Sequence, residues 1–313
     1  MAGPARIRHI ATMGDGIEVF DQGAVRRHRE RAAAGLGEHD FLLVEVAERL
    51  ADRLSDVKRR FPFALDLGCH RGEFGRALAG RGGIETLIHC DPSPAMVAHA
   101  PGPRLAAAED RLPFRAPAFD LVTSVLSLHW ANDLPGALIQ IARCLRPDGL
   151  LLAALLGGET LGDLRRALVE AELAERGGAS PRVSPFADIG DLGGLLQRAG
   201  LAMPVVDADT ITVTYPDAFA LMADLRGMGE SNAVADRVRH FTPRSVLAAA
   251  AAAYGAQHGD ADGRIPARFQ VLYLTAWKPH ESQPRALRPG SAEASLAETL
   301  EPGAHSRQGH KRV

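Results

Sequence analysis

Four residues around a predicted pair of strands have the types and spacing of a nucleoside-binding site. The apolar stretch 63–67 runs into a turn that contains Gly68 and Gly72, and glycines there let the backbone approach a ligand with no Cβ in the way. Asp66 lies at the end of this strand, and Asp91 ends the next strand, about 20 residues after the turn. A carboxylate at that point can accept hydrogen bonds from both hydroxyls of a ribose. The pattern therefore predicts a ribose-bearing ligand at the carboxyl ends of two parallel strands.

The turn resembles one family of cofactor sites and differs from two others. It is not GxGxxG and no GK[ST] follows, which argues against a dinucleotide or a nucleoside triphosphate. Its hhDxGxxxG arrangement resembles the S-adenosylmethionine (SAM) turn of class I methyltransferases, and CDPSPAMV (90–97), RLPFRAPAFDLVTS (111–124) and LRPDGLLL (145–152) resemble further landmarks of that family. The resemblance implies a Rossmann-like fold and SAM as cofactor, bound by Asp66, Gly68, Gly72, Asp91, Glu109, Asp110, Leu112 and Ser127.

Two residues depart from the family pattern. His70 stands where the middle glycine of LDLGCGxG is expected, and if φ is positive there the imidazole costs about 1 kcal/mol. Ala108 stands where the family usually has an aspartate that accepts a hydrogen bond from the adenine amino group. Glu109 or Asp110 could replace it, or backbone and apolar contacts could hold the adenine; losing one such hydrogen bond weakens binding by about 0.5–1.5 kcal/mol. We therefore expect a modified turn that still binds its ligand.

A closer resemblance rests on segments outside the generic fold. It is carried by VLSLHWANDLP (125–135), GGETLGDLR (157–165), SPRVSPFADIGDLGGLLQRAG (180–200), DLRGMGESN (224–232) and AWKPHESQ (276–283). These segments are similar to the mitochondrial complex I assembly factor 5 family, whose mitochondrial member is a protein-arginine hydroxylase. The resemblance implies a bacterial-type homologue that hydroxylates an arginine on a respiratory NADH dehydrogenase subunit during assembly. Two alternatives stay open: SAM-dependent methyl transfer to a small acid or a malonyl-carrier-protein-type ester, and a non-catalytic assembly factor.

Two groups of polar residues are candidates for catalysis. His129 and Trp130 follow the predicted strand 119–127, at the rim where the SAM sulfonium would lie. His129 could orient or deprotonate a substrate while Trp130 forms a wall, or the pair could be a capping histidine and a tryptophan at the edge of the core. Glu230 and Asn232 lie between two predicted helices. They could bind a guanidinium, or belong to a helix C-cap followed by a new N-cap.

A metal site is not expected. His89, Cys90 and Asp91 imitate the His-x-Asp part of a 2-His-1-carboxylate iron site, but no second histidine is placed to complete it. Glu159 and Thr160, which follow the fifth predicted strand, are further candidates for the site.

Strand and helix signals alternate from residue 61 onward, which is typical of a doubly wound parallel sheet. We expect an α/β fold with a seven-stranded, mostly parallel sheet and a helical cap insert. The predicted strands include 63–67, 86–91, 119–127, 205–214 and 268–278, and the predicted helices include 38–58, 72–80, 133–145 and 159–176. The predicted segments are an N-terminal lid-helix region (1–35), the core (36–215), the cap insert (216–264), the last core strand (265–278) and a disordered tail (279–313).

Two helix ends carry specific expectations. The arginine-rich helix at 20–31 has two interpretations: a solvated polar face, or a lid whose arginines approach a carboxylate. Asn132 is predicted to cap the helix 133–145, while Ser93 is predicted to cap the helix that starts at Pro94.

Composition excludes several classes of protein. The 313 residues have a net charge of −2, so nothing indicates a nucleic-acid partner. Three cysteines without a CxxC spacing argue against a disulfide framework or a zinc site. The N-terminus has no apolar signal region, and the apolar run at 150–158 is too short to span a bilayer. We expect no transmembrane segment and a location in the bacterial cytoplasm, with peripheral attachment to the inner membrane as a variant, or in the mitochondrial matrix if the source is a eukaryote.

Overall fold

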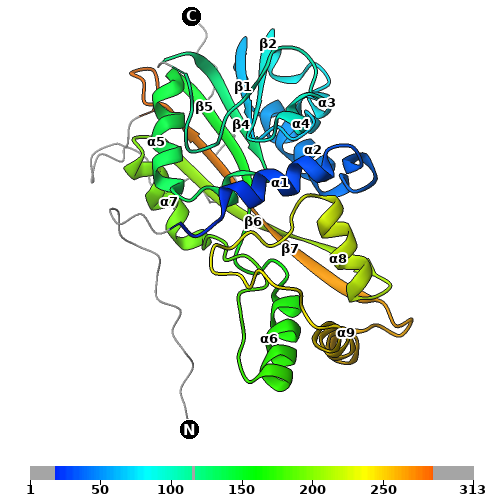
Figure 1. Cartoon of the computed structure of the whole chain (residues 1–313). Coiled ribbons are helices and arrows are strands. Elements are labelled where there is room, and N and C mark those ends of the chain that lie inside the picture. The colour runs from blue at the N-terminus through cyan, green and yellow to red at the C-terminus, as the bar shows by residue number, and fades with distance from the viewer. Residues whose placement is uncertain (1–17, 115–116, 285–313) are drawn as a thin grey trace, which may run out of the picture. The chain divides into compact units, whose positions relative to one another are not determined.

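The computed structural model describes residues 18–114 and 117–284. Within these residues seven strands form one sheet in the order β3-β2-β1-β4-β5-β7-β6 (Figure 1). Neighbouring strands from β3 to β5 are parallel, and β7 runs antiparallel to both β5 and β6. This arrangement confirms the predicted fold class. The strands are β1 Phe63–Leu67, β2 Thr86–Asp91, β3 Arg104–Ala106, β4 Phe119–Val125, β5 Leu145–Leu156, β6 Ala202–Tyr215 and β7 Ile265–Trp277.

Helices cover both faces of the sheet, as a buried parallel sheet requires. In the described residues they are α1 Gln22–Ala32, α2 Phe41–Ser55, α3 Glu73–Ala77, α4 Pro94–Val97, α5 Leu134–Cys144, α6 Gly162–Arg176, α7 Ile189–Arg198, α8 Ala218–Gly227 and α9 Arg244–His258. The predicted cap insert between β6 and β7 contains α8 and α9, with irregular backbone at 228–243.

The strands contribute side chains to two main hydrophobic clusters, one on each face of the sheet, because successive side chains point to opposite faces. Leu65 in β1 packs with Leu138 of α5 and Leu192 of α7 on one face. Its neighbour Ala64 belongs to the cluster on the other face, where Leu50 of α2 and residues of α6, α8 and α9 are also buried. The carboxyl ends of β1, β2 and β4 lie between these layers, next to α1, so side chains at that edge come from several distant segments.

Two local expectations need correction. Asn132 does not cap α5; Asp133 does, by accepting a hydrogen bond from the Gly136 amide at 2.8 Å. The helix predicted at 72–80 is shorter, because Ala79 has a positive φ of 45° that leaves the helical path. The Ser93 cap is confirmed, since its hydroxyl accepts a hydrogen bond from the Met96 amide.

Contacts divide the chain into Met1–Pro279 and His280–Val313. The first unit contains the whole sheet. In the second, the Gln283 amide donates to the His280 carbonyl in a turn, and the predicted tail beyond 284 lies outside the described residues, as do 1–17 of the predicted lid region. No helix in the described residues is both long and apolar enough to cross a bilayer.

Candidate functional site

The glycine turn after β1 is shaped by close contact with the end of β4. Gly68 has a φ of +66°, and a Cβ added there would lie 2.0 Å from Ser127 Oγ, so only glycine fits. Its amide donates to the Cys90 carbonyl at 2.7 Å, which ties the turn to β2. Asp66 is fully buried within β1, and one of its carboxylate oxygens, Oδ1, has no hydrogen-bond partner. An unpaired buried acceptor at this turn is available to a ligand that donates a hydrogen bond.

Asp91 ends β2 and contacts the glycine turn that follows β1. Both of its carboxylate oxygens accept hydrogen bonds. Oδ1 accepts from the Ser93 amide at 2.8 Å, and Oδ2 accepts from the His70 amide at 3.0 Å. The residue is fully buried. Burial raises the pKa of Asp91 above its usual value, although the nearby Arg29 and the two amides work in the opposite direction. These two hydrogen bonds fix the orientation of the Asp91 carboxylate, and its predicted role toward a ribose stays a prediction.

An arginine from α1 fills the space above these groups. The Arg29 guanidinium donates to Asp91 Oδ2 and to Glu109 Oε1, both at 3.1 Å, and to Ser127 Oγ at 2.8 Å. Its side chain is only 1% exposed. Burial alone would lower its pKa, but the charges of Asp91 and Glu109 outweigh that effect and raise the pKa of Arg29. The N-terminal helix thus places a positive charge against the predicted cofactor residues, and at Arg29 it approaches carboxylates where the alternative was a solvated face.

His70 occupies the turn in a strained but well-packed conformation. Its φ is +49°, in the left-handed region that is unfavourable for a residue with a Cβ. The imidazole is buried, and Nε2 lies 3.2 Å from the Val125 carbonyl oxygen at the end of β4. Burial, with a smaller effect from Arg29, lowers the pKa of His70 to about 4, so the ring is neutral near pH 7. A neutral Nε2–H can then donate to the Val125 carbonyl.

Three predicted catalytic candidates contact one another where the cap insert meets the end of β4: His129, Trp130 and Glu230. His129 and Trp130 lie in the short helix η3 Leu128–Trp130, while Glu230 follows α8. His129 Nε2 and Trp130 Nε1 approach Glu230 Oε2 at 3.2 and 3.1 Å. Burial raises the pKa of Glu230, but His129 and other neighbours outweigh it and lower the pKa below its usual value. Glu230 is therefore a charged carboxylate at neutral pH.

Backbone geometry brings Glu230 close to α1 as well. The preceding Gly229 has a φ of +84°, and a Cβ there would lie 3.4 Å from the Arg29 Cα. The Gln22 side chain donates to the Trp130 carbonyl at 2.7 Å. Helix α1 therefore contacts both the cofactor turn and the Glu230 group.

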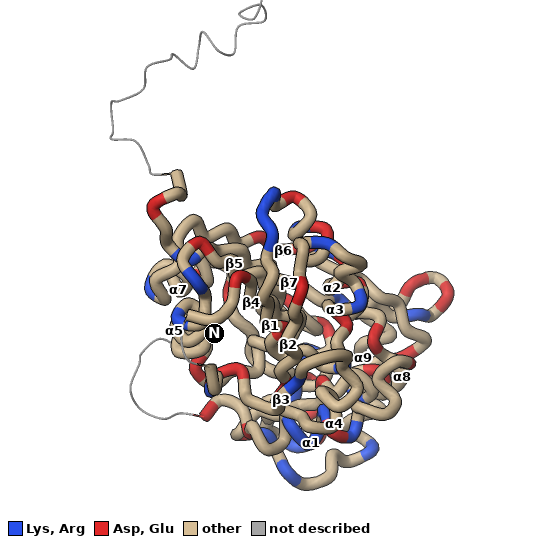
Figure 2. Tube along the Cα trace, turned by 90° about the horizontal axis from the view of Figure 1, so that it is seen from above, with Lys and Arg blue, Asp and Glu red and all other residues tan. Residues whose placement is uncertain are grey.

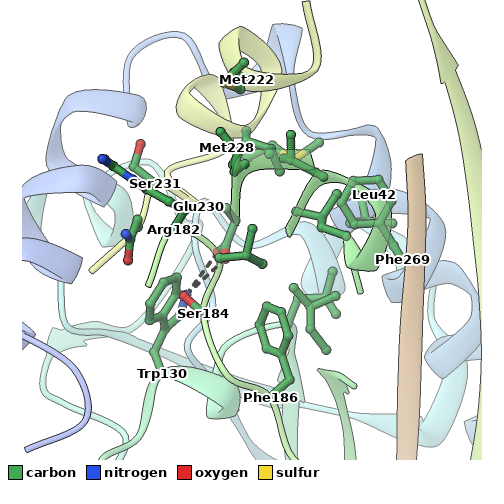
Figure 3. Close-up of a pocket in the computed structure, with 18 of the residues that line it drawn as sticks. Leu42, Trp130, Arg182, Ser184, Phe186, Met222, Met228, Glu230, Ser231 and Phe269 are labelled. Carbon is green, nitrogen blue, oxygen red and sulfur yellow. Dashed lines mark hydrogen bonds between the residues drawn. The ribbon is translucent and has the colours of Figure 1, made fainter. Parts of the chain in front are cut away.

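A cavity of about 280 Å³ lies next to Glu230, between the sheet and the cap. Its lining is mainly apolar, with Phe186, Met228 and leucines from α2, α6 and α9, and Figure 3 shows Glu230 joined to Trp130 by hydrogen bonds beside Phe186. Among the described residues that line it, Glu230 is the one carboxylate. The other charged lining residue, Arg182, is held by Glu172 through its Nε at 2.9 Å. The cavity therefore suits an apolar stem that ends in a cationic or hydrogen-bond-donating group.

Other candidate residues from the sequence lie apart from these contacts. Asn232 lines the cavity, but its amide is used by the backbone: Nδ2 donates to the Pro181 carbonyl and Oδ1 accepts from the Val234 amide. Glu159 and Thr160 lie beside β7, where Thr160 Oγ1 donates to the Gln270 carbonyl.

The cofactor candidates in the segment after β3 lie in two different places. Glu109 joins the Arg29 group, and Ser127 donates a short hydrogen bond to Glu109. Asp110 and Leu112 instead lie against α5, where the Asp110 carbonyl and the Leu112 amide both bond to the Gln140 side chain. Gly72, with a φ of +89°, starts α3. Of the two residues proposed to replace the missing aspartate at Ala108, Glu109 is the one that faces the turn.

His89 pairs with the first strand and not with Asp91. Its Nδ1 lies 3.1 Å from Asp66 Oδ2. Among the described residues, Asp66, Cys69 and His89 have potential ligand atoms within 4.8 Å of one another. Burial raises the pKa of the Cys69 thiol well above its usual value, so it is protonated at neutral pH. The His-x-Asp pattern of the sequence therefore does not correspond to a shared site for His89 and Asp91.

Comparison with known proteins identifies the family. Residues 65–153 match a methyltransferase domain. The chain is 42% identical to the mitochondrial arginine-hydroxylase NDUFAF5 of Danio rerio over 305 residues, which cover 95% of this chain and 94% of the relative, and 43% identical to that of Homo sapiens over 90% and 83%. The chain belongs to the NDUFAF5 family. A malonyl-[acyl-carrier protein] O-methyltransferase of Methylovorus sp. is 34% identical, with 83% of this chain and 90% of the relative covered.

The structural comparison supports the fold. The YcgJ protein of Bacillus subtilis has a TM-score of 0.53 with 15% identity and covers 74% of this chain and 98% of its own. The cofactor of the methyltransferase domain is SAM, and the chain offers groups that fit it. Asp66 has an unpaired buried acceptor, and Asp91, the residue predicted to bind the ribose, is a buried carboxylate at the end of β2. In this structure, however, Arg29 pairs with Asp91 and Glu109.

Proposed function

We propose that this chain hydroxylates an arginine side chain of a protein, and that the protein is a subunit of a respiratory NADH dehydrogenase undergoing assembly. The NDUFAF5 relatives are named arginine hydroxylases and are mitochondrial, and they match this chain over most of its length. A bacterial form of the protein would act from the cytoplasm, on the inner face of the membrane that holds the dehydrogenase.

The observation that carries this proposal is the charged Glu230 in a mainly apolar cavity. An arginine side chain has an aliphatic stem, which the apolar lining would accept, and a guanidinium, which a carboxylate binds through charge-assisted hydrogen bonds. His129 and Trp130 use three of the hydrogen-bonding positions of the Glu230 carboxylate, which has about four. They hold Glu230 in place and leave it an acceptor for the substrate.

The same carboxylate argues against the methyl-transfer alternative. A malonyl thioester carries a negative charge, which the charged Glu230 would repel. The cationic Arg182 is already paired with Glu172, so it is not available as a counter-charge. The cavity therefore favours a cationic substrate over an anionic one.

Hydroxylation inserts one oxygen atom into a C–H bond. When O₂ is the source, the second oxygen atom leaves as water, so two electrons and two protons must come from a reductant. The role we assign to this chain's own residues is to bind and orient the arginine: Glu230 at the guanidinium, Trp130 and Phe186 as walls, and His129 as the group that fixes Glu230.

The test is mass spectrometry of the dehydrogenase subunits in a strain that lacks this protein. Wild-type chain should restore a gain of one oxygen on one arginine peptide. Glu230→Gln should reduce that product by about 10- to 100-fold, because it removes a charged hydrogen-bond acceptor. Asp236→Asn, an exposed change in the same segment, should have no effect.

Two other outcomes would replace this proposal. Labelled methyl from SAM appearing on a carrier-protein ester would select the methyltransferase alternative. Full rescue of assembly by Gly72→Arg, which blocks the cofactor turn, together with no oxygen gain in the wild-type strain, would select the non-catalytic assembly factor.

A further inference from the structure

We propose that the cradle formed by Asp91, Glu109 and Ser127 is a guanidinium-binding site. Arg29 fills it in the form of the chain seen in this structure, which we call the closed form. SAM binds only when Arg29 leaves the cradle. The inference concerns the cofactor turn and does not depend on which reaction the neighbouring cavity supports.

The cradle is built for a planar cation with several donors. The guanidinium donates three hydrogen bonds through two of its nitrogens: Nη1 to both carboxylates and Nη2 to the Ser127 hydroxyl. Both carboxylates are buried, with side-chain exposures of 0% for Asp91 and 5% for Glu109. Two buried negative charges beside each other need a positive partner, and Arg29 supplies it.

The same atoms are those that the cofactor turn needs. Asp91 is the carboxylate placed to accept hydrogen bonds from ribose hydroxyls. Arg29 already donates a hydrogen bond to its Oδ2, so Arg29 and a ribose would compete for this oxygen. Ser127 and Glu109 border Gly68 so tightly that a Cβ there would meet both side chains. Arg29 thus occupies the polar groups at the turn, and a nucleoside must displace it to reach them.

A few identifiable side-chain contacts hold α1 in place. At the start of α1, Phe20, Ala24 and Val25 form a small cluster with Trp130, Ala233 and Val234. At its end, Ala32 is buried in the main cluster that also contains Leu50. Asn132 fixes the start of the helix with two hydrogen bonds to the Phe20 backbone, at 2.8 and 3.0 Å. Moving α1 would break these contacts but no strand pairing, because α1 is not part of the sheet. Figure 2 shows α1, with its arginine positions in blue, beside α4.

Calorimetric titration with SAM tests the competition directly. If the closed form holds about 90–99% of the molecules, Arg29→Ala should bind SAM about 10- to 100-fold more tightly than the wild type. Asn132→Ala, which loosens α1 and leaves the cradle untouched, should shift the affinity in the same direction. Arg31→Gln changes an exposed arginine of the same helix and should leave the affinity unchanged.

A second measurement identifies the ligand class. Methylguanidinium should raise the melting temperature of Arg29→Ala and weaken its apparent SAM affinity, because it refills the vacated cradle. It should do neither to the wild type, where Arg29 is in place. Inorganic ammonium at equal ionic strength serves as the control for a simple salt effect.

Three results would overturn the proposal. Weaker SAM binding in a folded Arg29→Ala would show that the arginine is a ligand of the cofactor. Unchanged SAM affinity in Asn132→Ala would show that α1 does not gate the site, and this variant decides the question if Arg29→Ala does not fold. Absence of any methylguanidinium effect on a folded Arg29→Ala would show that the cradle does not recognise guanidinium. Because no protein substrate is present, these results are independent of the hydroxylation test.

Discussion

At the scale of single residues, His70 combines an unfavourable backbone conformation with a fully enclosed ring. Its positive φ costs about 1 kcal/mol relative to glycine. The ring in return packs inside the turn and reaches the Val125 carbonyl. Because the ring is neutral in the folded protein, folding excludes a proton that the unfolded chain would bind.

The protonation of His70 predicts a pH dependence of stability. Its pKa is about 4 in the folded protein and about 6.5 in an unfolded chain. Between these values the unfolded state binds more protons, so the free energy of unfolding is highest above pH 6.5 and falls as the pH drops toward 4. From pH 7 to pH 5 the wild type should lose about 2 kcal/mol more than His70→Gln does, measured by chemical denaturation.

Parallel curves for the two proteins would contradict this assignment. His28, whose pKa is also lowered by burial, contributes in the same direction but is present in both proteins, so the difference between them reports His70 alone.

Residues fixed by one local motif could be predicted from the sequence, and residues fixed by tertiary contacts could not. Asp91 was located because a strand end and a glycine turn specify its position. Arg29 is hard to tell apart in the sequence from Arg26 and Arg27, because all three lie in one strongly polar segment. In the structure Arg26 and Arg27 are exposed, and only Arg29 of the three is buried. A signal existed: Val25, Arg29 and Ala32 recur at helical spacing and form the buried face of α1.

At the scale of elements, the loop 177–187 is held against α6 by one buried carboxylate. Glu172 accepts hydrogen bonds from Ser180 and from Arg182. Burial raises the pKa of Glu172, but these bonds outweigh it and lower the pKa to about 2. The loop supplies Ser184 and Phe186 to the cavity wall, so its position depends on this contact.

We expect Glu172→Gln to lower the free energy of unfolding by about 3 kcal/mol, because it leaves the mostly buried Arg182 without its counter-charge. Glu170→Gln, an exposed change on the same helix, should alter stability by less than about 0.5 kcal/mol. Urea denaturation of both variants measures the difference. Equal stability of the two variants would show that the loop is held by other contacts.

Element prediction failed where an element is short or ends for a local reason. Strand β3 has three residues, too few to show an alternation of apolar and polar side chains. Helix α5 begins one residue later than Asn132 suggested, because that amide bonds to the distant Phe20. Longer elements such as α2, with Leu42, Val46 and Leu50 on its buried face, followed their periodicity.

At the scale of the whole molecule, the sheet separates two hydrophobic clusters, and their described residues extend no further than Trp277. The fold class could be predicted because alternation of strands and helices, together with apolar strands, has few solutions. The contact between the segment 228–243 and η3 could not be predicted, because Glu230 and His129 are about a hundred residues apart in the chain.

Removal of the residues after Pro279 tests where the stable part of the chain ends. We expect the truncated chain to melt within about 1 °C of the full chain, because β7, the last element of the sheet, is complete at Trp277. Differential scanning calorimetry measures this, and a decrease of several degrees would show that the removed segment contributes to the fold.

The position of β7 also affects how the protein is made. This strand lies between β5 and β6, and β6 has no other strand neighbour in the described sheet. While the ribosome is still adding residues before Ile265, β5 therefore has one open edge and β6 has no strand partner, and both are able to pair with other chains. Premature termination in that interval should give insoluble fragments, so the cell must shield the growing polypeptide until its final strand emerges.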